Sequence, residues 1–159
     1  MMAELDYLPA LLALPVLVAV AYNDMRFMRI PGWLPVVLAL IFLLTAPMIG
    51  WDETVARIAV ALAVFVLCFF LQVIRVMGGG DVRTLSAIML IVPSASLLFF
   101  LQCFSIALVA GCLITLVLHP RPVPSDNGWA ASRARGHLPM GLSVAIAGFA
   151  LASLGLVSP

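Results

Sequence analysis

The amino-acid sequence predicts an all-α membrane protein, a bundle of six transmembrane helices that forms one domain over residues 1–159. Two observations predict this class. Hydrophobic residues make up 65% of the chain and charged residues 9%, whereas a water-soluble domain has about a quarter of its residues charged. The apolar residues also form runs of about the length that crosses a bilayer, so we expect a lipid bilayer around them. The net charge of +1 gives no electrostatic basis for a nucleic-acid partner.

Five apolar runs reach or approach the roughly 17 to 25 residues that a transmembrane helix needs. They span residues 7–22, 33–49, 54–74, 95–118 and 138–157. A shorter stretch, residues 82–92, lies between the third and fourth runs. As a single helix, residues 82–118 would be about 55 Å long, too long for one crossing. Pro93 can end a helix, and Ser94 and Ser96 can cap the next one, so we predict a short fourth helix.

The last apolar run carries small residues near helical spacing, which predicts a face for close helix packing. These residues are Gly141, Ala145, Gly148, Ala152 and Gly155. Pro15 and Pro47 are expected to bend their helices. Residues 119–137 are rich in Pro, Ser, Gly and Arg and show no apolar period, so we expect a loop there.

The arginines predict how the helices face, because arginines in short loops gather on the cytosolic side of a membrane. With six crossings, seven of the eight arginines lie in loops 23–32, 75–83 and 119–137 on one side, and Arg57 alone lies opposite. Five crossings would remove this bias. We therefore expect the three loops to face the cytosol and both termini to face outward.

Two carboxylates stand at this predicted cytosolic boundary among arginines. Asp24 closes the first helix, and Asp81 precedes the fourth. Each has a structural interpretation: Asp81 could cap its helix, because Asp at an N-cap bonds the free amides of the first turn. Asp24 could be an interfacial carboxylate paired with Arg26. The residues alone leave these interpretations open beside a catalytic one.

Three glycines, Gly78, Gly79 and Gly80, directly precede Asp81. A cap does not explain them, because glycines cost backbone entropy and weaken a helix. Consecutive glycines are typical of a place where another backbone comes very close or where the chain adopts positive φ angles. We take them as candidates for binding an extended substrate backbone.

Two aspartates at one face predict acid–base chemistry, because like charges cannot both ionise cheaply and such a pair holds one proton between its members. One member removes a proton from the water that attacks a peptide carbonyl, and the other supports the developing oxyanion. This chemistry requires no cofactor and no metal. His119 and His137 are more typical of solvated interfacial histidines than of metal ligands. The cysteines, which lie in apolar runs without a C-x-x-C pair, are expected to be apolar filler.

The sequence Gly78-Gly79-Gly80-Asp81, with Asp24 upstream and Ile30-Pro31 after the first helix, resembles the GxGD-type aspartic peptidases of the type IV prepilin peptidase family. Leu138-Pro139-Met140-Gly141 looks like the start of that family's last helix. The resemblance covers the chain from its first helix to its last. Gly32, Arg83 and Met140 depart from the usual Asn, Lys and Tyr, so the resemblance extends to the pair of acids and not to substrate preference.

The resemblance implies that Asp24 and Asp81 are the catalytic pair of an endopeptidase in the prokaryotic inner membrane. Its partners would be pilin-like precursors, each with a basic leader before a hydrophobic helix, and a pilus assembly machinery. The chain lacks the paired C-x-x-C segment of the bifunctional members, so it resembles the short peptidase-only form of tight-adherence (Flp-type) systems. A non-catalytic scaffold of a pilus or secretion apparatus is the main alternative, and a transporter with a proton relay through both aspartates is a third.

Overall fold

The computed structural model describes residues 2–27, 30–75, 77–118 and 140–157, and nearly all of these residues are helical. Six α-helices follow one another, with a single 3-10 turn, η1, between the fourth and fifth. Their bounds are α1 Met2–Phe27, α2 Trp33–Ile49, α3 Trp51–Val73, α4 Gly79–Ile91, η1 Ser94–Ser96, α5 Leu97–Leu118 and α6 Met140–Val157. The predicted all-α fold and its short fourth helix are confirmed.

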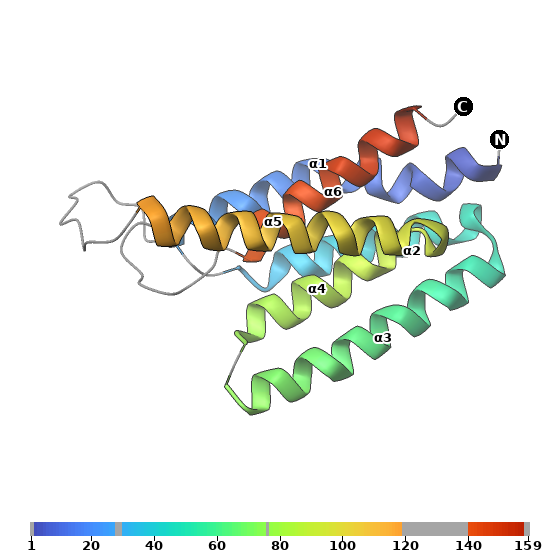
Figure 1. Cartoon of the computed structure of the whole chain (residues 1–159). Helices are drawn as coiled ribbons and strands as arrows, with labels where there is room; N and C mark the ends of the chain where they lie inside the picture. Colours follow the sequence, from blue (N-terminus) through green and yellow to red (C-terminus); the bar gives the residue numbers. More distant parts are fainter. Residues whose placement is uncertain (1, 28–29, 76, 119–139, 158–159) are drawn as a thin grey trace.

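The helices pack side by side in an order that differs from their order in the chain (Figure 1). α1 packs against α6 and α2, α4 packs against α2 and α3, and α5 packs against α6. α3 and α5 therefore contact the bundle mainly through one neighbour each. The core between the helices is built from small and branched residues. Among them are Ala13, Leu17, Leu38, Val82, Ile88, Ala147 and Leu151.

The outer faces of the helices are apolar and exposed, as a lipid-facing surface must be. Leu44 of α2 is 70% exposed, Phe70 of α3 is 63% exposed and Leu98 of α5 is 75% exposed. Three segments are long and apolar enough to cross a membrane: 6–27, 51–73 and 94–111. α2 and α6 are apolar but shorter. These features identify a helical membrane protein.

The turn between α2 and α3 is short and locally determined. Gly50 alone joins α2 to α3, with a φ of 100° that favours glycine. Its carbonyl accepts hydrogen bonds from the amide and the hydroxyl of Thr54. Arg75, with a φ of 61°, turns the chain after α3. α2, α3 and α4 run in alternating directions (Figure 1).

The turn after α4 differs from the prediction in how its serines are used. Pro93 follows the last residues of α4, as expected, but neither serine caps a helix through its side chain. The Ser94 hydroxyl instead bonds the Glu53 carboxylate, and the Ser96 hydroxyl lies 2.6 Å from the Tyr7 hydroxyl. The serines therefore connect this turn to α3 and α1, because neighbouring helices offer them better partners than the next helix start.

Candidate active site

Asp24 lies near the C-terminal end of α1 and is buried, with 7% of its surface exposed. The helix continues to Phe27, so Asp24 lies inside it and does not close it as the sequence suggested. Its Oδ2 accepts a hydrogen bond of 2.7 Å from the Gly141 amide, and its carboxylate also accepts one from the Leu142 amide. Both donors lie in the first turn of α6, where backbone amides have no partner within the helix. The Asp24 carboxylate thus provides hydrogen-bond acceptors for amides at the start of α6.

Arg26 does not pair with Asp24, although that was one interpretation of the sequence. The Arg26 guanidinium donates a hydrogen bond to the Tyr22 hydroxyl. It also lies 5.6 Å from the centre of the Tyr22 ring and 5.3 Å from that of the Phe27 ring. This exposed arginine points along its own helix, because the aromatic rings on that face attract its charge. The hydrogen bonds to the Asp24 carboxylate come from backbone amides of α6.

Asp81 is half-buried in the first turn of α4. The capping residue of α4 is Gly78, so the interpretation of Asp81 as the N-cap is wrong by three positions. The Asp81 carboxylate reaches back and accepts a hydrogen bond from the Gly78 amide. This is the role that an acidic residue plays in a capping box. A Cβ on Gly78 would lie only 3.0 Å from Oδ2 of Asp81, so the glycine leaves room for the carboxylate.

The structure brings Asp24 and Asp81 together. The C-terminal end of α1 and the N-terminal end of α4 lie at the same end of the bundle (Figure 1). The two carboxylates are near enough for the charge of Asp81 to act on Asp24. Two carboxylates 57 positions apart in the sequence therefore lie at one end of the bundle, where the charge of one acts on the other. Such a pair can hold a proton between its members and exchange it with a water molecule or a peptide.

The other two glycines of the run also face parts of the chain. A Cβ on Gly79 would lie 3.0 Å from Nε2 of Gln72, an exposed residue at the end of α3. One on Gly80 would lie 3.4 Å from the Ile30 carbonyl oxygen. The expectation of a close backbone approach is therefore met at Gly80. The alternative of positive φ angles is wrong, because Gly50 is the glycine with positive φ in the described part of the chain.

Two neighbours of the pair were not identified from the sequence as parts of the site. Gly141 was assigned to packing, and the contact with Asp24 adds a hydrogen bond to that packing. Gln72 gave no signal, because a polar residue at the end of a transmembrane helix is ordinary. Its side chain nevertheless lies against the glycine run that leads to Asp81.

Metal-binding residues do not gather near the aspartates. In the described ranges, no group of three or more His, Cys, Asp and Glu residues could hold a metal ion. His119 and His137 lie outside the described residues.

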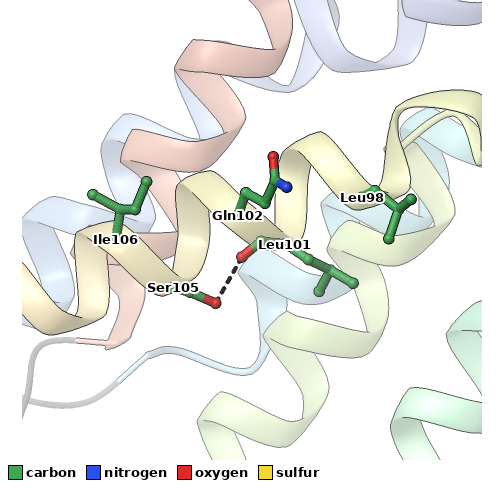
Figure 2. Close-up of a pocket in the computed structure, with 5 residues that line it drawn as sticks. All are labelled: Leu98, Leu101, Gln102, Ser105 and Ile106. Carbon is green, nitrogen blue, oxygen red and sulfur yellow. Dashed lines mark hydrogen bonds between the residues drawn. The ribbon is translucent and has the colours of Figure 1, made fainter.

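A separate hollow lies on α5 and is not part of this site. Figure 2 shows its lining, which comes entirely from that helix. The lining residues are Leu98, Leu101, Gln102, Ser105 and Ile106. The Ser105 hydroxyl donates a 2.8 Å hydrogen bond to the Leu101 carbonyl and so is satisfied within its own helix. No ionisable group lines the hollow.

Comparison with known proteins gives one match. The family model described as the type IV leader peptidase family matches residues 11–119. The matched range contains both aspartates and the glycine run and ends before α6. No curated protein and no solved structure matches the chain.

Proposed function

Because the chain belongs to the type IV leader peptidase family, we propose that it is an aspartic endopeptidase of the inner membrane. In this proposal it removes leader peptides from pilin-like precursors of the Flp type. One observation carries the proposal: Asp24 and Asp81 come from different helices to the same end of the bundle, where their charges interact. Membership of the family indicates the class of reaction, and the Asp24 and Asp81 carboxylates are groups able to carry it out.

The proposed mechanism uses one proton that the two carboxylates share. The ionised member takes a proton from a water molecule, and the resulting hydroxide attacks the peptide carbonyl. The protonated member donates to the oxygen that becomes negative in the tetrahedral intermediate. Collapse of the intermediate breaks the C–N bond: the leaving amine takes up a proton from one carboxyl group, and a hydroxyl of the intermediate returns its proton to the other, so the pair again holds one proton. One water molecule is consumed, and no cofactor takes part.

The proposed substrate is a precursor with a basic leader before a hydrophobic helix. In such a precursor, the junction between leader and helix lies at the cytosolic boundary of the membrane. We propose that Asp24 and Asp81 face this boundary. Arg26 and Arg83 are exposed at the same end of the bundle as the pair, which supports this orientation. We further propose that Gly78, Gly79 and Gly80 hold the substrate backbone extended, and that the enzyme works beside a pilus assembly machinery.

Co-expression with a candidate pilin precursor tests the proposal. The mass of the precursor's N-terminus is compared between the wild-type protein, Asp24→Asn and Asp81→Asn. We expect cleavage by the wild type and none by either variant, because each variant removes one member of the pair. Asp52→Asn is the matched control, since Asp52 is an exposed carboxylate at the start of α3 and should be dispensable.

The outcomes separate the proposal from its alternatives. A scaffold would leave the precursor uncut by the wild type and would tolerate all three substitutions in pilus assembly. A proton-coupled transporter would lose transport in both dyad variants without ever cutting the precursor. Either result would overturn the peptidase proposal, provided that membrane fractionation shows each variant inserted at the wild-type level.

A further inference from the structure

Gly141 contacts Asp24 more closely than packing alone requires. Its amide donates a 2.7 Å hydrogen bond to Oδ2 of Asp24. A Cβ at position 141 would lie 2.8 Å from Cβ of Asp24 and 3.0 Å from both Cγ and Oδ2. Real side chains do not approach this closely, so any residue other than glycine would force the carboxylate or the helix to move. The lack of a side chain at Gly141 and the hydrogen bond from its amide therefore both affect the position of the Asp24 carboxylate.

Two other glycines of α6 contact α1 and provide an internal comparison. A Cβ on Gly148 would lie 2.4 Å from Cδ1 of Leu17, and one on Gly155 would lie 2.7 Å from Cβ of Tyr7. At these positions glycine only permits the two helices to approach. At Gly141 the neighbour is an acid, and a hydrogen bond accompanies the close approach. Helix packing explains the first two contacts completely and the third only in part.

The direction of an aspartate in a helix is not determined by the helix alone, because its side chain can rotate. Asp24 receives no charged partner among the described residues, where the ion pairs are those of Arg57. Its orientation depends on the amides at the start of α6. These donors are rigid, since they belong to a helix that packs along α1. A misplacement of a reacting group by about 1 Å can lower a rate on the order of 100-fold.

We propose that Gly141 is a positioning residue of the peptidase. Its amide fixes the Asp24 carboxylate in the orientation that couples it to Asp81, and its lack of a side chain leaves room for that carboxylate. This inference rests on the proposed function. It assigns a role in the reaction to α6, which lies outside the range that the family model matches.

The test compares Gly141→Ala with Gly155→Ala in the full-length protein, purified in detergent, acting on a synthetic pilin-like precursor. The two variants add the same methyl group at similar distances from a Cβ atom of α1. We expect kcat of Gly141→Ala to fall roughly 10- to 100-fold with KM within about twofold of wild type, because a displaced carboxylate slows chemistry and leaves substrate binding intact. Gly155→Ala should keep kcat within about threefold, since its effect is structural.

A second variant removes the donor without adding volume. Incorporation of glycolic acid at position 141 replaces the amide with an ester, which cannot donate a hydrogen bond. We expect kcat to fall in this ester variant as well. It tests the proposal even if the methyl group added in Gly141→Ala prevents folding. Full kcat in the ester variant, or equal losses in the two alanine variants, would overturn the positioning role. A wild-type protein that cuts no precursor would instead overturn the proposed function.

Discussion

Arg57 is a fully buried charge at the end of the bundle opposite Asp24 and Asp81. Its Nε donates to the Glu53 carboxylate at 2.9 Å, and its two terminal nitrogens donate to the carbonyls of Ile91 and Asp6 at 3.2 and 3.1 Å. From the sequence, Arg57 is an exception to the arginine pattern. The structure explains the exception, because the guanidinium joins α1, α3 and α4. Its partners are 4 to 51 residues away in the chain, so spacing alone could not have predicted the set.

We expect Arg57→Met to destabilise the protein without changing its chemistry. Loss of one partner of a buried ion pair costs roughly 3 to 5 kcal/mol. The lower end applies, because the Glu53 and Asp6 side chains are 22% and 34% exposed. Thermal unfolding in detergent measures the loss, with the exposed Arg26→Met as the control. An unchanged unfolding midpoint would show that Arg57 does not hold these helices together.

The glycine run makes a second prediction at this scale. Gly79 faces the exposed side chain of Gln72, which can move to admit a substituent. We therefore expect Gly79→Leu to fold normally and to lower precursor cleavage, because the leucine occupies the space proposed for the substrate backbone. Peptide mass analysis and thermal unfolding together measure both effects. The control is Ala95→Leu, at an exposed position in η1 at the opposite end of the bundle. Full cleavage by Gly79→Leu would refute backbone binding at this glycine.

Among the helices, the predictions were accurate where the apolar pattern determines the element. Residues 33–49 were predicted as a helix and are α2, and the small-residue face of α6 does pack against another helix. The pattern could not reveal that the other helix is α1, because helical spacing defines a face and not its partner. It also placed the start of α4 after the glycine run, although Gly79 and Gly80 lie in its first turn. The glycines are helical there because the Asp81 carboxylate caps the Gly78 amide.

The α1–α6 contact predicts the effect of a larger residue in the middle of α6. Gly148→Leu should lower the free energy of unfolding by about 1 to 3 kcal/mol, because overpacking forces neighbouring atoms apart. Phe149→Leu is the control, since Phe149 is 43% exposed on the outer face of the same helix. Thermal unfolding of the two variants makes the comparison. Equal unfolding midpoints would mean that α1 and α6 move apart at position 148 without loss of stability.

For the whole molecule, counting arginines favoured six helices over five, and the described residues form six α-helices. Six crossings require the end of the first helix and the start of the fourth to lie at one end of the bundle, and the C-terminal end of α1 and the N-terminal end of α4 do lie there (Figure 1). How close the two acids come could not be predicted, because it depends on α2 packing between α1 and α4. The sequence therefore predicted that both acids lie at one end of the bundle, and tertiary packing determined how the helices that carry them are arranged.

Cysteine labelling in membrane vesicles tests which compartment each end of the bundle faces. In a background without native cysteines, we expect Arg26→Cys and Arg83→Cys to react only with reagent on the cytosolic side. Trp51→Cys and Ala95→Cys should react only from the opposite side. All four positions are exposed, so accessibility is limited by the membrane and not by burial. Labelling of positions 26 and 83 from different sides would contradict the six-crossing topology.

The hydrogen bond between Gly141 and Asp24 also bears on the order in which the molecule matures. The acids belong to α1 and α4, and the helix whose amide donates to Asp24 is synthesised after both of them. A nascent chain still on the ribosome would thus hold its two carboxylates in the bilayer before the final donor arrives. Under the proposed function, the Asp24 carboxylate would reach its working orientation only once α6 has inserted beside α1.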